Sequence, residues 1–192
     1  MLQRNLLTSL ICLYFVISAH PAFAVADTIS LPLETITVVH KKTHESKYFS
    51  GGHQSASVAN NASVDILLHV GTIPIHTIFL ATTDGAALGY LYEGVTYSSS
   101  GSALTVSNHN RENPVASTAT AYHTPTVSAT GAQIDGIAQI AGGAGPHAIG
   151  GSSSHLTGEI ILARNTDYLL RITNISGSSQ RMTSHFEFYE PD

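Results

Sequence analysis

The chain has 192 residues, a mass of 20.2 kDa and a formal net charge of −5, which fits a single domain and argues against a basic nucleic-acid binder. It holds 20 threonines and 22 serines but only 3 lysines and 7 glutamates, so it is poor in the residues that favour exposed helices. This composition predicts an all-β protein made of strands joined by turns.

The first 24 residues are typical of a secretory signal. Arg4 lies in a short polar start, an apolar run extends from Leu6 to Ala19, and Ala22-Phe23-Ala24 offers a small-residue cleavage site. The apolar run is shorter than the ~20 residues that span a bilayer, so we expect no stable membrane span once the signal is removed. An uncleaved N-terminal anchor is the alternative. The only cysteine, Cys12, lies in this run, so no disulfide framework is expected in the mature chain.

Strand patterns follow at short intervals, with no sustained helical period. The clearest are Val64–Val70 and Met182–Phe188, where apolar and polar residues alternate with a period of 2. The runs Ile75–Ala81 and Leu88–Tyr92 flank Thr83-Asp84-Gly85, and an Asp-Gly pair between β-rich runs predicts a hairpin. In chain order, the remaining expected strands are Thr35–His40, Leu104–Ser107, Thr118–His123, Gln133–Ile140, Glu159–Leu162 and Tyr168–Asn174.

The stretch Ala141–Ser154, AGGAGPHAIGGSSS, is too rich in glycine and serine to pack, which predicts a long loop. The strands on either side are too few to close separate cores. We therefore expect one domain over residues 25–192, an antiparallel β-sandwich of the jelly-roll type.

Eleven histidines raise the possibility of a metal site, because neutral imidazole is a common ligand. Their spacing argues against it. His40 and His44 lie in a charged stretch without a helical face, His69 and His76 lie on separate expected strands, and His147 and His155 lie in or beside the glycine-rich loop. Histidines at a surface or interface are the favoured alternative to a histidine-dependent metalloenzyme.

The chain carries neither a Gly-x-Ser-x-Gly elbow nor a His-Glu-x-x-His motif. Asp65, Glu93 and Glu187 fall on expected strands, but nothing in the sequence brings them together. The glycine-rich loop lacks the Gly-Lys-Ser/Thr ending of a phosphate-binding loop. We therefore expect no catalytic residues, no cofactor and no enzymatic activity.

The most polar interior stretch is His109-Asn110-Arg111-Glu112-Asn113, which ends at Pro114. It can be a loop that reaches a partner, or a turn in which asparagine side chains bond to their own backbone. Residues predicted to contact a partner are His109, Asn110, Arg111, Glu112, Gly143 and His147. The loops expected to carry such contacts are Ser98–Ser102, His109–Pro114 and Ala141–Ser154.

Four segments resemble, in the same order, those of a family of structural proteins from the virions of tailed bacteriophages. The longest is the C-terminal run LARNTDYLLRITNISG, residues 162–177, followed by FEFYE at 186–190. The others are His44-Glu45 before Tyr48-Phe49, Leu91-Tyr92-Glu93 before a Ser/Gly stretch, and Asn108-His109-Asn110-Arg111 before Tyr122-His123-Thr124-Pro125-Thr126-Val127. The resemblance covers roughly residues 36–190.

This resemblance implies a β-sandwich subunit that binds other virion proteins and itself, as a head decoration or minor capsid component, with no catalytic residues.

The only lysines, Lys41, Lys42 and Lys47, lie near the start of the mature chain. Later strand edges therefore have little charge protection, which suits a subunit whose edges are covered by neighbours.

A secretory signal is out of place on a virion protein assembled in the cytoplasm. Three explanations stay open: a misassigned start codon, an apolar arm specific to the phage, or a host-derived secreted protein that kept the domain. The rival function is accordingly a secreted or periplasmic bacterial domain that binds or adheres to a carbohydrate or a surface polymer.

Overall fold

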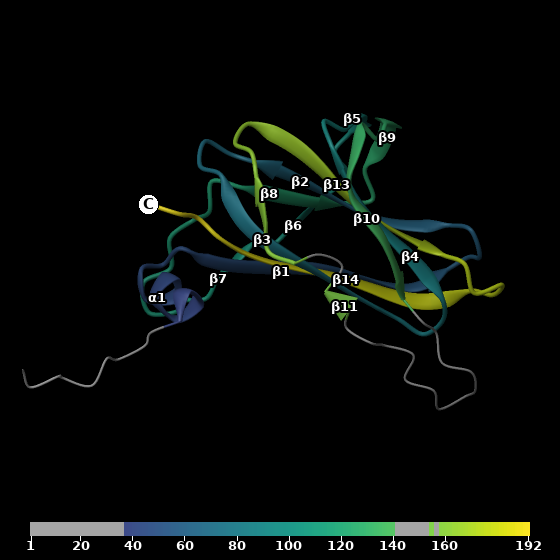
Figure 1. Cartoon of the computed structure of the whole chain (residues 1–192), viewed down its shortest axis with the longest axis horizontal. Coiled ribbons are helices and arrows are strands. Elements are labelled where there is room, and N and C mark those ends of the chain that lie inside the picture. Colours follow the sequence, from purple (N-terminus) through teal and green to yellow (C-terminus); the bar gives the residue numbers. More distant parts are fainter. Residues whose placement is uncertain (1–36, 141–153, 156–157) are drawn as a thin grey trace, which may run out of the picture. The chain divides into compact units, whose positions relative to one another are not determined.

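The computed structural model describes residues 37–140, 154–155 and 158–192, and Ile36–Asp192 form one compact unit. The predicted signal segment, residues 1–24, lies outside the described residues. The described part is an all-β sandwich of antiparallel sheets (Figure 1), which confirms the predicted fold class. No helix among these residues is long and apolar enough to cross a membrane.

Among the described residues, one short helix precedes the strands in chain order. The elements are α1 (Val38–His44), β1 (Tyr48–Val58), β2 (Ser63–Val70), β3 (Ile75–Thr83), β4 (Ala87–Glu93), β5 (Thr96–Ser99), β6 (Ser102–Leu104), β7 (Ser107–Asn108), β8 (Thr120–His123), β9 (Thr126–Ala129), β10 (Ala132–Ile140), β11 (Ser154–His155), β12 (Ile160–Leu162), β13 (Thr166–Asn174) and β14 (Gln180–Tyr189).

In the described part of the chain, two six-stranded sheets form the layers. Sheet A has the order β11-β3-β14-β1-β7, with β12 also paired to β3. Sheet B has the order β10-β4-β13-β2-β8-β6, and a separate two-stranded ribbon joins β5 to β9. The first long strand, β1, therefore lies beside the last one, β14, and β2 lies beside β13.

The main core lies between the inner faces of the two sheets. Phe49 and Phe188 stack with their ring centroids 5.2 Å apart, and both are buried. Because alternate residues of each strand point inward, the period of 2 in the sequence becomes this apolar layer. The larger side chains of the core are Phe49, Phe79, Phe186, Phe188, Ile66, Leu68, Ile75, Leu91, Leu162, Tyr168 and Leu170.

The alternation fails at Leu67 on β2 and Leu169 on β13, which point away from the main core and are nevertheless fully buried. They form a smaller cluster with Val95, against which Tyr97 and Val127 of the β5–β9 ribbon pack. The ribbon thus covers part of the outer face of sheet B. Both faces of sheet B are buried at this place, which explains the unbroken apolar triplets Ile66-Leu67-Leu68 and Tyr168-Leu169-Leu170.

The strand predicted at Thr35–His40 is wrong, because helix α1 begins at Val38. Thr37 caps the helix, since its hydroxyl accepts a hydrogen bond from His40 N at 3.3 Å. Lys41, Lys42 and His44 fall in the last turn, where the charges of the two lysines suit the negative end of the helix. The capping hydroxyl and the favourable charges therefore outweigh the preference of the β-branched residues in this segment for a strand.

The predicted hairpin at Thr83-Asp84-Gly85 is also wrong. Strands β3 and β4 exist, but β3 pairs with β14 in sheet A and β4 pairs with β13 in sheet B. The Asp-Gly turn carries the chain from one sheet to the other. Each strand has its own apolar face, and both faces are buried when the strands lie on opposite sides of the core.

Strand β1 was not predicted, because its Gly- and Ser-rich sequence YFSGGHQSASV has no apolar alternation. Its glycines make room for its neighbour: a Cβ on Gly51 would lie 2.5 Å from Cζ of Phe186, and one on Gly52 would lie 2.8 Å from the carbonyl oxygen of Ser184. The apolar side chain that covers Gly51 thus comes from β14. The predicted strand Leu104–Ser107 is not continuous, because Leu104 ends β6 in sheet B and Ser107 begins β7 in sheet A.

Candidate functional site

The polar stretch after β7 forms a turn of the kind that asparagine favours. Asn108 Oδ1 accepts a hydrogen bond from Asn110 N at 2.8 Å, and Asn110 Oδ1 accepts from the backbone N of Glu112 and of Asn113, both at 3.2 Å. The two asparagines therefore shape the loop. The turn interpretation accounts for Asn110, because its side-chain oxygen bonds to the backbone of the turn itself.

The same loop is bound to the segment that follows α1. Asn108 Nδ2 donates to Ser46 O at 2.7 Å, Asn110 Nδ2 donates to Ser46 Oγ at 2.9 Å, and Ser46 Oγ donates to Asn113 O at 2.7 Å. Arg111 and Glu112 are exposed at its tip. Of the predicted contact residues, Arg111, Glu112 and also His109 are thus exposed at the surface.

His109 belongs to a polar cluster on the outer face of sheet A. Its ring meets Tyr48 edge-on with centroids 4.7 Å apart, and its Nε2 lies 2.8 Å from Ser50 Oγ. Tyr48 OH donates to Glu187 at 2.5 Å. This hydrogen bond lowers the pKa of Glu187 against the effect of burial, while burial and then Glu187 raise the pKa of Tyr48.

The pair of Ser50 and His109 has the spacing of a nucleophile and a base. A catalytic arrangement also needs an acceptor that bonds to His109 Nδ1, and the contacts of the described residues include none. The nearby carboxylate of Glu187 instead accepts from Tyr48 OH and lies 3.3 Å from His185 Nε2. The cluster therefore holds the end of β1 against β7 and β14.

The other predicted contact residues, Gly143 and His147, lie outside the described residues. His40 and His44 meet edge-on on α1 with centroids 4.6 Å apart. Within residues 37–140, 154–155 and 158–192, no three His, Cys, Asp or Glu side chains gather in a way that could hold a metal ion.

The outer face of sheet B carries a surface that we call the tyrosine face, made of Tyr90, Tyr92, Arg171 and Asp65. Tyr90 and Tyr92 alternate on β4, are half-buried and have ring centroids 6.0 Å apart. Tyr90 lies opposite Arg171 on β13, which in turn lies opposite Asp65 on β2. The β5–β9 ribbon packs near Tyr92.

Arg171 is held in place by Asp65. Its Nε and one terminal nitrogen donate to the two carboxylate oxygens at 2.8 and 2.7 Å, a bidentate geometry that fixes the plane of the guanidinium. The hydrogen bond to Asp65 raises the pKa of Arg171 further, despite partial burial. Two tyrosine rings and a fixed guanidinium thus lie side by side. The alternation Tyr90-Leu91-Tyr92 was a signal for this face, whereas the pairing with Arg171 depended on the sheet order.

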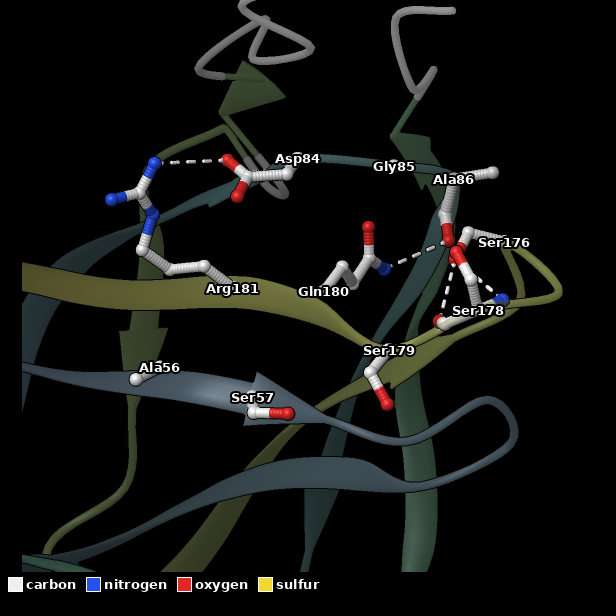
Figure 2. A pocket seen from close by; sticks show the side chains of 10 residues that line it. All are labelled: Ala56, Ser57, Asp84, Gly85, Ala86, Ser176, Ser178, Ser179, Gln180 and Arg181. Atoms are coloured by element: carbon white, nitrogen blue, oxygen red, sulfur yellow. Dashed lines mark hydrogen bonds and ion pairs between the residues drawn. The ribbon is translucent and has the colours of Figure 1, made fainter. Parts of the chain in front are cut away.

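A concave feature, which we call the end pocket, lies where the β3–β4 and β13–β14 turns meet the end of β1. Its volume is about 530 Å³. Figure 2 shows Asp84, Gly85 and Ala86 on one side, Arg181 and Gln180 of β14 in the middle, and Ala56 and Ser57 of β1 on the other side. Ser176, Ser178 and Ser179 complete the lining. Sequence reasoning missed this pocket because three separate segments build it.

The floor of the end pocket is fixed by Asn174, which is fully buried. Its Nδ2 donates to Val58 O at 2.8 Å and to Ser178 O at 2.7 Å, and its Oδ1 accepts from Ser176 N and Gln180 Nε2, both at 2.8 Å. One side chain therefore ties the ends of β1, β13 and β14 together.

Gly85 is required by the side chain beneath it. Gln180 Nε2 also donates to Ala86 O at 3.2 Å, which places Gln180 Oε1 under Gly85, without a hydrogen-bond partner among the described residues. A Cβ at position 85 would overlap this oxygen and lie 2.7 Å from Ser176 Cβ. The turn thus sits directly on its buried support.

Two histidines bridge the sheets on the side of β1 and β8. His53 of β1 and His123 of β8 stack with centroids 3.9 Å apart and an interplanar angle of 11°. His53 lines a depression of about 320 Å³, together with Asp65 and Thr124. Burial, and to a smaller extent His123, lowers the pKa of His53.

Stability is therefore expected to fall as the pH drops below about 6.5. In the unfolded chain His53 is protonated at its ordinary pKa, whereas in the folded chain it is protonated only at a lower pH. The stability contributed by neutral His53 is therefore fully present above the ordinary pKa and is lost as the pH falls towards the lowered pKa of the folded chain. In His53→Phe, which keeps an aromatic ring, the free energy of unfolding in urea should depend less on pH. The exposed His40→Phe serves as the control, and an unchanged pH dependence in His53→Phe would contradict the assignment.

Comparison of the chain with protein-family models, with curated proteins and with solved structures finds no match.

Proposed function

We propose that this chain is a non-enzymatic structural subunit of a phage particle, a capsid decoration or minor virion protein. It acts through contacts with other virion proteins and with copies of itself. The resemblance of its segments to phage virion proteins supports this proposal, and the tyrosine face is the observation that carries it.

Tyrosine and arginine are enriched among the residues that contribute most to protein–protein binding, because they offer a large rigid surface with polar groups at its edge. Tyr90 and Tyr92 offer such a surface because they lie two residues apart on the same face of β4. Arg171 beside them is held in one orientation by Asp65. A partner that covers this face therefore loses little free energy to the ordering of these side chains.

The strand order supports the finer description of the sandwich as a jelly roll. The order β1-β14-β3 in one sheet and β2-β13-β4-β10 in the other alternates between early and late strands, as two nested Greek keys do. Jelly rolls are used by viral capsid proteins and also by lectins, so the order alone does not separate the two functions.

The edges of the sheets are protected by means other than lysine. Lys42 and Lys47 pair with Asp192, and Lys41 and Lys42 pair with Glu45, all close to α1. Edge strand β6 has only three residues, and the register of β10 shifts twice along β4. Short strands and bulges discourage edge pairing. We therefore place the contact on the tyrosine face and not on an edge.

The proposal predicts that purified phage particles contain this chain and that Tyr90→Ala reduces its occupancy at least about tenfold, the effect of losing one major contact residue. The measurement is the ratio of this chain to the major capsid protein in density-purified particles produced with each variant. Circular dichroism checks that the variant is folded.

Gln54→Ala is the matched control, because Gln54 is exposed on the outer face of sheet A and should leave occupancy unchanged. Normal occupancy with Tyr90→Ala would reject the tyrosine face as the contact. Absence of the chain from particles, with a product lacking residues 1–24 outside the cytoplasm, would reject the virion role in favour of a secreted binding domain.

A further inference from the structure

We propose that the end pocket binds a neutral sugar residue through its hydroxyl groups. This goes beyond the proposed contact function, because the pocket belongs to a different part of the molecule and recognises a small polar unit. It would serve a virion subunit or a secreted domain equally.

The composition of the lining selects the ligand. The pocket offers the hydroxyls of Ser57, Ser176 and Ser179, the carboxylate of Asp84 and the guanidinium of Arg181 (Figure 2). Hydroxyls both donate and accept, a carboxylate accepts from two adjacent hydroxyls, and a guanidinium donates. A volume of about 530 Å³ falls within the usual range for small-ligand sites of about 300–1,000 Å³.

The charges of the lining favour a neutral ligand. Asp84 Oδ1 and a terminal nitrogen of Arg181 are 3.4 Å apart, and both side chains are more than half exposed. An ion pair this exposed contributes little to stability, so both groups can turn towards a ligand at little cost. Because the two charges offset each other, neither an anion nor a cation gains a net attraction.

Three of the four serines are available for binding. The hydroxyls of Ser57, Ser178 and Ser179 form no hydrogen bond with any side chain or backbone group in the described part of the chain, whereas Ser176 Oγ donates to Ser178 O at 3.0 Å. The methyl groups of Ala56 and Ala86 add small apolar surfaces to the lining. These suit the C–H groups of a sugar ring.

The pocket is also preorganised. Asn174 and Gln180 lock the two turns from beneath, and Asp84 N donates to Arg181 O at 3.1 Å, which fixes the backbone that carries the charged pair. The backbone of the lining is therefore already ordered before a ligand binds, and only the exposed side chains of Asp84 and Arg181 have to adjust.

The test is a titration of the isotope-labelled full chain, followed by NMR, with the methyl glycosides of glucose, galactose, mannose and rhamnose and with glycerol as the polyol control. At least one glycoside is expected to shift the amide signals of Gly85, Ala86 and Ser178–Arg181 with saturation, while glycerol does not. Asp84→Asn, which keeps the shape of the side chain, should weaken this binding about tenfold, as expected for the loss of a charge-assisted hydrogen bond.

Glu112→Gln, an exposed carboxyl on the loop after β7, is the matched control and should bind like the wild type. Ser179→Ala should weaken binding as well, and provides a second variant should Asp84→Asn not fold. Absence of a saturable shift at the pocket with every glycoside, or wild-type affinity in both variants, would overturn the proposal. Asp84→Asn should leave particle occupancy unchanged, so this proposal and the proposed function fail separately.

Discussion

Replacement of Phe186 by aspartate is expected to unfold the sandwich. Phe186 lies at the centre of β14, is fully buried, and packs beside Phe188 with centroids 6.2 Å apart. Its ring also fills the space left by Gly51 on β1. The substitution removes this packing and buries an unpaired carboxylate, which together cost several kcal/mol, comparable to the whole stability of a typical domain of about 5–15 kcal/mol.

The measurement is thermal unfolding followed by circular dichroism. Phe186→Asp should have no cooperative transition, and Ile66→Asp, on the facing sheet, should behave in the same way because Ile66 is also fully buried. Ile161→Asp is the matched control, since Ile161 lies on β12 with 62% of its surface exposed. A Phe186→Asp protein that melts like the wild type would mean that the inward faces of the strands are assigned wrongly.

Replacement of Asn174 by alanine is expected to lower the free energy of unfolding by about 3 kcal/mol or more. The change removes four hydrogen bonds: those from Asn174 Nδ2 to the carbonyls of Val58 and Ser178, and those from Ser176 N and Gln180 Nε2 to Asn174 Oδ1. Each hydrogen bond contributes about 0.5–1.5 kcal/mol net, and a buried group left without any partner costs about 1–3 kcal/mol. For a protein of this size, 3 kcal/mol corresponds to a decrease in Tm of roughly 6–12 °C.

Urea unfolding at equilibrium gives the free energy directly. Asn113→Ala is the control, because Asn113 is exposed and a change of less than about 0.5 kcal/mol is expected there. If Asn174→Ala were as stable as this control, the buried amide would not be what ties the three strand ends together.

The strands predicted with the clearest alternation are confirmed as β2 and β14, and Tyr168–Asn174 is confirmed within β13. This works because the pleat places every second residue on one face, so a sheet with one buried face leaves its period in the sequence. The unbroken triplets at Leu67 and Leu169 carried further information that the alternation pattern could not express, namely burial on both faces.

Strand β1 left no such period. Its polar and glycine residues become a strand because β14 supplies both the hydrogen-bond partner and, through Phe186, the apolar surface. The stretch 48–58 and its partner 180–189 are far apart in the chain, so no local window contains the reason for the strand.

The amino-acid sequence by itself determined the fold class and the inward residues of the regular strands, because composition and a period of 2 are local properties. It also offered the asparagine turn after β7 as one of two alternatives, because the bonds of such a turn join residues only two or three positions apart. These features need no knowledge of which strands are neighbours.

Only the tertiary structure decided which strands share a sheet, and hence that the Asp84-Gly85 turn joins two layers instead of closing a hairpin. It also decided both candidate sites, because the tyrosine face requires β4, β13 and β2 in adjacent positions, and the end pocket requires two turns and the end of β1 around Asn174. Strand neighbours are selected by the burial of whole apolar faces across the core, and that energy depends on residues that lie far apart in the chain.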